Sequence, residues 1–372
     1  MQRLGFLDGL RGIAALYVVL FHMALVPSFK PPLSEWWQTL VLFGGSGVTL
    51  FFVVSAFSLC LTMDRHVATG SALLSYGLSR VFRIAPLFYF VMIVTYAIHI
   101  RAFGVWHSPR EVLLSLTFLF NLVPGAEQGY VWASWTIGVE MLFYIVFPYL
   151  YFRQSGPSRM IATLCVALAV SILFKGVTAG FVPETVRGSF ENFSIFRHMP
   201  SFVMGMLAYT AYHSAKLAEA RRQYAGALVA FGFLVLVGVA SGRLTNGVLD
   251  TTHLVAAGYS FILLGASAAH FRLVDNSATR FLGKISYSVY LWHAPVVWFM
   301  SPAYQRITAL PLPASLRFLL CLAVTLCIVV PVAWATYRFV ELPGIALGKR
   351  VFQRLAPARP VTIIEPAIKQ PA

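Results

Sequence analysis

The chain has 372 residues, of which 59% are hydrophobic and 11% are charged, and its net charge is +15. Soluble domains carry roughly 25% charged residues, so this composition excludes an ordinary soluble protein and indicates one embedded in a membrane. The basic residues are spread over many loops rather than gathered into one stripe, so we expect no nucleic acid as a partner. The four Cys residues lie in apolar runs without the spacing of metal ligands, and we expect neither a disulfide framework nor a metal site.

Apolar runs recur along the whole chain, and most have the roughly 17 to 25 residues that a helix needs to cross the hydrocarbon. We therefore predict an all-α fold, a polytopic membrane helix bundle with about ten transmembrane helices. The runs are 10–26, 40–62, 85–99, 135–152, 160–174, 196–212, 225–240, 254–269, 285–300 and 316–337. A further run, 112–123, is short, and we interpret it as a re-entrant or interfacial helix.

The distribution of Lys and Arg predicts the orientation, because cytoplasmic loops carry an excess of both. With a cytoplasmic N-terminus and no crossing at 112–123, the basic loops all lie on the cytoplasmic side. They contain Arg65, Arg80 and Arg83; Arg153 and Arg159; Lys216, Arg221 and Arg222; Arg272, Arg280 and Lys284; and Lys349, Arg350 and Arg354. Both termini are then cytoplasmic, with a membrane domain at 1–350 and a short disordered tail, rich in Pro and Ala, at 351–372.

The first apolar run carries two polar residues, Arg11 and His22. Their spacing makes about three helical turns, so both side chains project from nearly the same face, about 16 Å apart along the axis. An ionisable residue inside a bilayer costs several kcal/mol unless a partner or a water-filled cavity compensates. His22 is therefore a candidate functional residue.

The second run is rich in small residues. They favour close helix packing, and they would also leave room for an acyl chain. They are Gly44, Gly45, Ser46, Gly47, Ser55 and Ala56.

The third run is preceded by Arg80 and Arg83, which lie three residues apart on one helix face. One interpretation is simple anchoring at the cytoplasmic surface. The other is a phosphate clamp, because the planar guanidinium group matches phosphate oxygens. Arg11 lies on the same side of the membrane, so three guanidinium groups would converge on one nucleotide-like polyanion.

The fourth run, 135–152, contains Glu140 in an otherwise apolar stretch. By helix rise, Glu140 lies roughly 9 Å deep from the outer side and His22 roughly 6 Å deep. A carboxylate at that depth would orient His22 and raise its basicity. The alternative is a lone Glu hydrogen-bonded to a neighbouring helix.

His293 occurs at a similar depth in the run 285–300, with Tyr287 and Tyr290 on the same segment. It is either part of an aromatic belt at the membrane interface or one of the buried polar residues together with His22 and Glu140. The matching depths of His22, Glu140 and His293 predict one internal cavity.

These segments together resemble the acyltransferase-3 family of integral membrane O-acyltransferases. The matching motifs, in order, are LDGLRGIAALYVVLFH, FFVVSAF, SRVFRIAP, SWTIGVEMLFY, FRHMPSFVMGM, LGKISYSVYLWH and YRFVELP. The resemblance implies a multi-pass protein of the bacterial plasma (inner) membrane. It implies transfer of an acyl group, acetyl being the common choice, from cytoplasmic acyl-CoA to a hydroxyl of a carbohydrate or glycolipid.

The resemblance also assigns roles to residues. His22 is expected to be the general base, with Glu140 as its catalytic partner, although a covalent acyl-His intermediate stays open. Arg11, Arg80 and Arg83 are expected to bind the acyl-CoA phosphates. We place the acceptor near four further residues of the matching motifs, His293, Tyr287, Trp135 and Arg197.

The sequence departs from the family pattern at two places. Ser55-Ala56-Phe57 stands where relatives have Ser-Gly-Phe, and a single acid, Glu140, stands where the acid is often doubled. The chain also ends soon after YRFVELP, so we expect no appended hydrolase-like domain. The rival interpretation is a transporter or flippase that uses the intramembrane His and Glu as a proton relay, and a structural scaffold ranks third.

Overall fold

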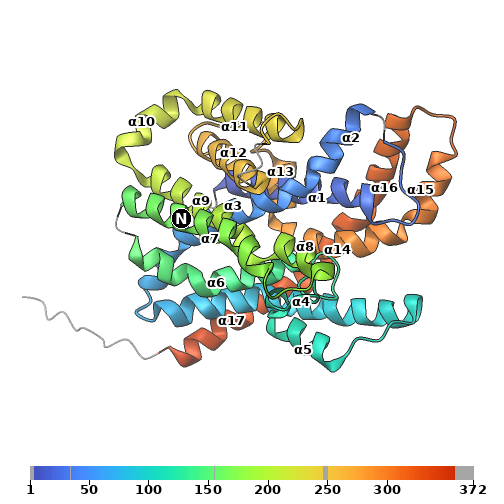
Figure 1. The fold of residues 1–372 in the computed structure, drawn as a ribbon, viewed down its shortest axis with the longest axis horizontal. Coiled ribbons are helices and arrows are strands. Elements are labelled where there is room, and N and C mark those ends of the chain that lie inside the picture. Colours follow the sequence, from blue (N-terminus) through green and yellow to red (C-terminus); the bar gives the residue numbers. More distant parts are fainter. Residues whose placement is uncertain (1–3, 34, 155, 246–249, 357–372) are drawn as a thin grey trace, which may run out of the picture.

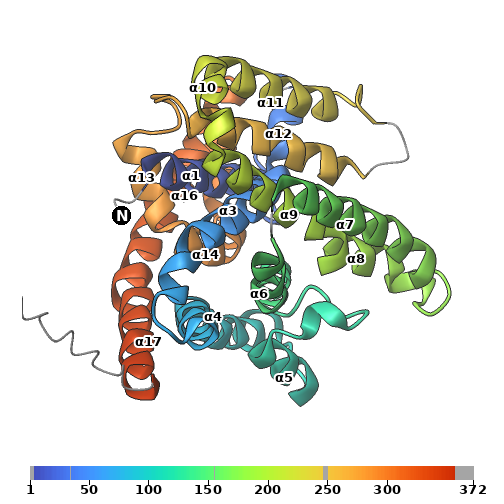
Figure 2. The same cartoon turned by 90° about the vertical axis from the view of Figure 1, so that its left-hand side faces the viewer.

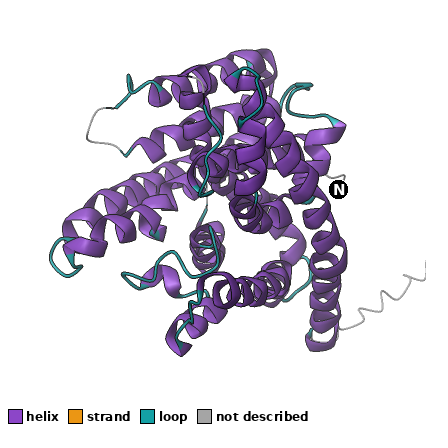
Figure 3. Cartoon of the chain, turned by 90° about the vertical axis from the view of Figure 1, so that its right-hand side faces the viewer, coloured by secondary structure: helices purple, strands orange, loops and turns teal. Residues whose placement is uncertain are grey.

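The computed structural model describes residues 4–33, 35–154, 156–245 and 250–356. Among these residues every regular element is a helix and no strand occurs (Figure 3), which confirms the predicted all-α fold. The long helices are α1 (Gly5–Leu25), α3 (Gly47–Val67), α4 (Ala72–Phe103), α6 (Trp135–Arg153), α7 (Pro157–Thr178), α9 (Ile195–His213), α11 (Ala225–Ala240), α12 (Thr251–Ala266), α14 (Ser286–Phe299), α16 (Ala314–Thr336) and α17 (Leu342–Leu355). The short ones are α2 (Glu35–Leu42), η1 (Phe43–Ser46), α5 (Pro109–Thr117), η2 (Phe120–Leu122), α8 (Glu184–Phe193), α10 (Ala215–Gln223), α13 (Ser277–Lys284), α15 (Ser301–Thr308) and the π-helix η3 (Tyr337–Glu341).

Each predicted apolar run coincides with a helix, but fewer of these helices have the length of a full crossing. Among the described residues, six helical segments are long and apolar enough to cross a membrane, or seven if the bent pair α10–α11 forms one span. α12 has 16 residues and α14 has 14, fewer than the roughly 17 needed for a crossing. The helix lengths therefore support an integral membrane protein, but they do not confirm the predicted number of ten transmembrane helices.

The short run 112–123 does not form one continuous helix. α5 begins with a capping box in which the Ser108 side chain accepts from the Glu111 amide, and it has only nine residues. It ends at Phe118, whose φ of 59° is left-handed, and the turn η2 follows. At about 1.5 Å per residue this helix is far too short to span a bilayer.

α1 and α3 occupy the middle of the bundle, with α10, α11 and α12 on one side and α4, α5 and α17 on the other (Figure 1). Small residues allow the central helices to approach closely. A Cβ built on Gly47 would lie 2.8 Å from the Ala14 carbonyl oxygen of α1, and one built on Gly205 of α9 would lie 2.3 Å from the Val53 carbonyl oxygen of α3. Both distances are too short for a real side chain, so only Gly fits at these two positions. At Gly47 this agrees with the close helix packing predicted for the small residues of the second run.

The C-terminal segment continues α16 through the π-helix η3 into α17. α17 packs against α4, and the two helices lie in the same lower part of the molecule in Figure 2. The predicted domain boundary at 350/351 falls inside α17, and residues 357–372 of the predicted tail lie outside the described residues.

Candidate active site

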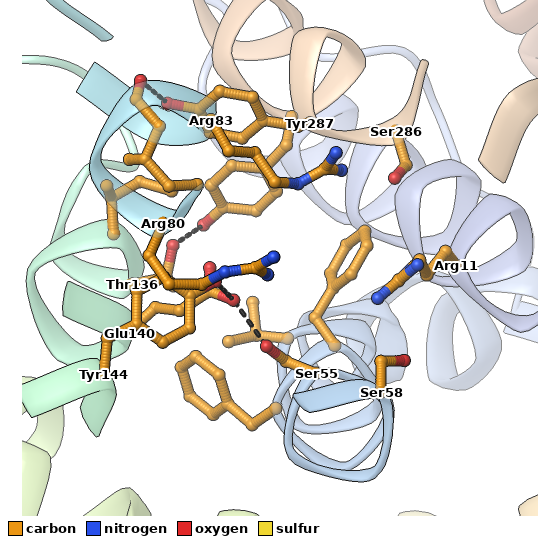
Figure 4. Close-up of a pocket in the computed structure, with 16 residues that line it drawn as sticks. Arg11, Ser55, Ser58, Arg80, Arg83, Thr136, Glu140, Tyr144, Ser286 and Tyr287 are labelled. Atoms are coloured by element: carbon orange, nitrogen blue, oxygen red, sulfur yellow. Dashed lines mark hydrogen bonds between the residues drawn. The ribbon is translucent and has the colours of Figure 1, made fainter. Parts of the chain in front are cut away.

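Three arginines line one narrow cavity between α1, α3, α4, α6 and α14, which we call the arginine cavity. Its free volume is about 80 Å³, and its polar lining includes Arg11, Arg80, Arg83, Ser55, Glu140 and Tyr287. Figure 4 shows the guanidinium groups of Arg80 and Arg83 extending into this space from α4, with Arg11 reaching in from α1 on the opposite side. The predicted convergence of Arg11 with Arg80 and Arg83 is thus present in the structure.

Arg83 is held in this position by an acid at the end of the π-helix. Arg83 Nη1 lies 3.6 Å from Oε1 of Glu341, whose side chain is fully buried. The Ser288 hydroxyl of α14 donates to Oε2 of Glu341 at 3.2 Å. The sequence analysis gave Glu341 no role, although an acid within the apolar motif YRFVELP was the signal for it.

Glu140 belongs to the arginine cavity rather than to His22. Its Oε1 accepts hydrogen bonds from the Ser55 hydroxyl and from the Tyr144 hydroxyl, each at 2.6 Å (Figure 4). Arg80 lies over the ring of Tyr144, 5.9 Å from its centre. The expected contact between Glu140 and His22 is therefore not formed, because Ser55 and Tyr144 are the groups that bind the carboxylate.

The partner of His22 is His293 of α14. Nε2 of His293 lies 3.1 Å from Nδ1 of His22, and the two rings are 4.6 Å apart. Nδ1 of His22 also lies 2.9 Å from the Val18 carbonyl oxygen, and Nδ1 of the fully buried His293 contacts the Tyr290 carbonyl oxygen.

These contacts assign the hydrogens of the two rings. A carbonyl oxygen only accepts, so Nδ1 of each histidine must carry the hydrogen. Nε2 of His293 then accepts from Nδ1 of His22. Nε2 of His22 is left with a free lone pair, as a general base requires.

His22 lines a second and larger cavity, which we call the aromatic cavity. Its volume is about 900 Å³, and its lining includes His22, His99, Trp132, Trp135, Tyr290 and Trp298. The two cavities share Val48 and Tyr290 in their linings. The prediction of a single internal cavity for His22, Glu140 and His293 is therefore wrong: His22 and Glu140 line two adjoining cavities, and the fully buried His293 lines neither of them.

The separation of the cavities follows from the directions of the helices. Arg11 lies near the start of α1 and His22 near its end, while α4 carries Arg80 in its first half and His99 in its last turns. α14 likewise begins with Ser286 and Tyr287 in the arginine cavity and ends near Trp298 in the aromatic cavity. The two cavities thus lie toward opposite ends of the same helices.

The other predicted acceptor residues lie in three different places. Trp135 lines the aromatic cavity, where its ring lies 5.1 Å from that of His198. Tyr287 lines the arginine cavity instead, and its hydroxyl donates to the Ile84 carbonyl oxygen at 2.7 Å. Arg197 lines neither of the two cavities.

Arg197 forms a bidentate pair with Asp250 at the start of α12. Its Nε and Nη2 donate to the two carboxylate oxygens at 2.8 and 2.9 Å. Burial opposes ionisation of Asp250, but the hydrogen bonds and positive charge of Arg197 outweigh it and lower the pKa of that carboxyl group. This pair joins α9 to α12.

Apart from Trp135 and Tyr290, the aromatic lining of the second cavity was not predicted from the sequence. His99 and Phe103 come from the end of α4, and Gln128 and Trp132 come from the irregular segment before α6. Trp132 and Trp298 are far apart in the sequence, and only the folded chain brings their rings together. Within the described residues, no group of three or more His, Cys, Asp or Glu side chains is arranged to hold a metal ion.

Comparison with known proteins identifies relatives of the whole membrane unit. ORF330 of the Acidianus two-tailed virus, whose name designates an acetyltransferase, is 26% identical over 76% of this chain and 80% of its own. The exopolysaccharide production protein ExoZ of Rhizobium meliloti (strain 1021) is 26% identical over 82% of this chain and 91% of its own. The O-acetyltransferase OatA of Staphylococcus aureus is 22% identical over 93% of this chain but only 58% of its own.

No solved structure matches the chain significantly. The acyltransferase domain family, by contrast, matches residues 4–334, which include every residue that lines either cavity, while Glu341 behind Arg83 lies beyond this range. This match covers most of the chain and contains the two arginines of α4, the pair of His22 and His293, and Glu140. The chain therefore belongs to the acyltransferase-3 family.

Proposed function

We propose that this protein is a membrane O-acyltransferase that moves an acyl group, most simply acetyl, from cytoplasmic acyl-CoA to a hydroxyl of a carbohydrate or glycolipid. The proposal depends above all on one observation. The arginine cavity and the cavity that contains His22 meet at Val48 and Tyr290, with Arg11 and His22 on the same helix. The family and the names of its relatives support acyl transfer, and the name of ExoZ points to a polysaccharide.

The donor would bind through its phosphates to Arg11, Arg80 and Arg83. Arginine presents planar donors that match phosphate oxygens, and three such groups facing one cavity repel one another unless an anion lies between them. Glu341 offsets the charge of Arg83 through the 3.6 Å contact, and Glu140 is a second acid in the cavity lining. Two carboxylates against three guanidinium groups leave an excess of positive charge for an anionic ligand. The thioester would then extend about 16 Å along α1 towards His22.

The chemical step would use the free lone pair of His22. Nε2 removes the proton of the acceptor hydroxyl as its oxygen attacks the thioester carbonyl carbon. The C–O ester bond forms, the C–S bond breaks, and the proton on His22 passes to the departing CoA thiolate. His293 acts as a positioning residue that fixes the hydrogen of His22 on Nδ1, the role that the sequence analysis gave to Glu140.

The proposal also includes the orientation of the protein in the membrane. The positive-inside rule places both termini and the arginine cavity on the cytoplasmic side of the bacterial plasma membrane. Acyl-CoA then meets the arginines directly, and the aromatic cavity opens towards the outer side.

The test uses purified protein in liposomes with radiolabelled acetyl-CoA and surface glycan as acceptor. We expect His22→Ala to reduce transfer by at least about a hundredfold, the usual contribution of a general base. Arg80→Gln with Arg83→Gln should raise the KM for acetyl-CoA at least tenfold, about 1.4 kcal/mol of lost donor binding. The double variant Arg153→Gln with Arg159→Gln removes the same charge elsewhere on the cytoplasmic side and should leave the KM unchanged.

Two results would contradict the proposal. Wild-type transfer by His22→Ala would remove this histidine from the mechanism. Movement of the acceptor across the membrane without consumption of acetyl-CoA would show a transporter or flippase instead.

A further inference from the structure

The aromatic cavity does not end at His22 but continues to the molecular surface. A neighbouring space of about 620 Å³ shares His99, His107, Gln128, Gly129 and Trp132 with it. The two spaces adjoin along these residues, and together we call them the outer groove. It runs from His22 along the end of α4 to α5 and the segment before α6.

Several aromatic rings line the walls of the outer groove. The rings of Trp132 and Trp298 lie 6.1 Å apart, and that of Trp132 lies 5.5 Å from His99. Further out, His107 stacks on Tyr130 with their centres 4.2 Å apart and an angle of 22° between them. Such rings combine large apolar faces with polar edges.

Polar groups stand beside these rings. Nδ1 of His99 lies 2.7 Å from Nε2 of His107, whose Nδ1 lies 3.7 Å from Oε1 of Glu111. The exposed amide of Gln128 donates to Ser189 at 3.2 Å and keeps an accepting oxygen. The groove therefore offers both flat apolar faces and hydrogen-bonding groups along its length.

Charge is distributed unequally along the groove. The described lining around His22 contains no Lys, Arg, Asp or Glu side chain. Charged residues occur only in the outer space, where Arg110, Glu111 and Glu127 lie. A charged group beside His22 would be desolvated without a partner, at a cost of several kcal/mol.

We propose that the outer groove binds the acceptor and that the acylated unit is an uncharged pyranose ring. A pyranose has apolar C–H faces that pack on aromatic rings and hydroxyl groups at its edge that need hydrogen-bonding partners. Trp132 and Trp298 hold the unit nearest His22, and Tyr130 with His107 holds a preceding unit of the same chain. This proposal rests on the proposed function, because it places a hydroxyl of the bound sugar at Nε2 of His22.

The test measures acetylation of surface glycans by mass spectrometry in cells that carry only the variant gene. We expect Trp132→Ala to reduce acetyl groups per glycan about tenfold, as for loss of one well-packed aromatic anchor, and Trp132→Phe to retain most of them. Thermal unfolding of the purified Trp132→Ala and Trp132→Phe variants in detergent controls for loss of the fold. Trp334→Ala, on the exposed face of α16, is the matched control and should acetylate normally.

The same spectra identify the sugar that carries the acetyl group. An acetylated neutral unit supports the proposal, whether the glycan is free or still attached to a lipid carrier, and acceptors supplied in both forms distinguish these sources. An acetylated uronic acid or phosphorylated sugar, or normal acetylation by Trp132→Ala, overturns it. These outcomes are distinct from failure of the proposed function, in which wild type would acetylate no glycan and consume no acetyl-CoA.

Discussion

Single side chains in this protein are fixed mainly by contacts between distant segments. His22 and His293 are separated by most of the sequence, yet each orients the other's ring. The hydrogen on Nδ1 of His22 has two acceptors, the Val18 carbonyl oxygen and Nε2 of His293. Loss of one acceptor leaves the ring of His22 less well oriented, and we expect this to affect the rate of the chemical step more than the binding of either substrate.

Two substitutions of His293 should therefore have different effects. His293→Leu fills similar space but cannot accept a hydrogen bond, and we expect it to lower kcat by about tenfold to a hundredfold. His293→Gln retains an accepting oxygen and should lose less. The KM for acetyl-CoA should not change in either variant, because the arginine cavity is untouched.

Steady-state kinetics with purified protein separates these quantities. If His293→Leu raised the KM of the acceptor at unchanged kcat, His293 would be an acceptor-binding residue, as the sequence analysis first placed it. Thermal denaturation of both variants controls for loss of the fold.

The sequence predicted those site residues that are polar in an apolar setting. Arg11, Arg80 and Arg83 were expected to converge, and they do so because helical spacing and membrane orientation limit where they point. The partner of Glu140 was not predictable, because depth alone does not say which neighbouring helix lies alongside. The contacts of Trp132 depend on an irregular segment, for which the sequence contains no periodic signal.

At the scale of helices, close approach of backbones organises the centre of the molecule. α3 lies between α1 and α9, with Gly47 at the first contact and Gly205 at the second. Because lipid gives no hydrophobic driving force between helices, such close contacts supply much of their association. α1, which carries both Arg11 and His22, is one of the helices that these contacts hold together.

Gly205→Ala should therefore destabilise the protein. The new Cβ would lie 2.3 Å from the Val53 carbonyl oxygen, so α9 must move away from α3. Overpacking of this kind costs about 1–3 kcal/mol, more than the roughly 1 kcal/mol that Ala gains over Gly in a helix.

The measurement is the midpoint of thermal unfolding in detergent. Gly226→Ala is the matched control, because no atom lies within 4 Å of its added Cβ, and its midpoint should be equal or higher. Equal stability of Gly205→Ala and wild type would show that the contact between α3 and α9 is not close in the membrane.

Helix boundaries were predicted well where apolar runs are long and poorly where the backbone geometry changes. The runs 10–26 and 135–152 correspond to α1 and α6 within a few residues. The π-helix at Tyr337–Glu341 has no distinctive composition, and the sequence does not reveal that its extra residue per turn directs Glu341 inward to Arg83. The bend of 78° between α10 and α11 was likewise missed.

For the whole molecule, the main question is which end faces the cytoplasm. The proposed orientation requires that the segment around α5 does not cross the membrane. The turn after η2 then lies outside, and the start of α10 lies inside.

Single cysteines test both points together. In a chain with Cys60, Cys165, Cys321 and Cys327 replaced by Ala, we expect Pro124→Cys to react with a membrane-impermeant maleimide on intact cells. Ala215→Cys should react only after the membrane is permeabilised, because the adjacent Lys216, Arg221 and Arg222 favour the cytoplasmic side. Both positions are exposed in the structure, so a lack of labelling reflects the membrane rather than burial.

Labelling of Ala215→Cys on intact cells, with Pro124→Cys labelled only after permeabilisation, would mean either that 112–123 crosses the membrane or that the whole orientation is reversed. Labelling of both positions from the same side would mean that an even number of segments, and not the proposed three, crosses the membrane between them. Mass spectrometry of the labelled chain gives the result for each position.

A protein that receives one reactant from each side of a bilayer must not let protons or ions leak through it. Val48 and Tyr290 are the side chains that both cavities touch, so they form the partition where the two openings come closest. In the proposed orientation this partition has to admit a small acyl unit while it holds back protons and ions. The positions of these two side chains, rather than their chemistry, would then keep the passage closed between turnovers. The cell's ion gradients would depend on that closure.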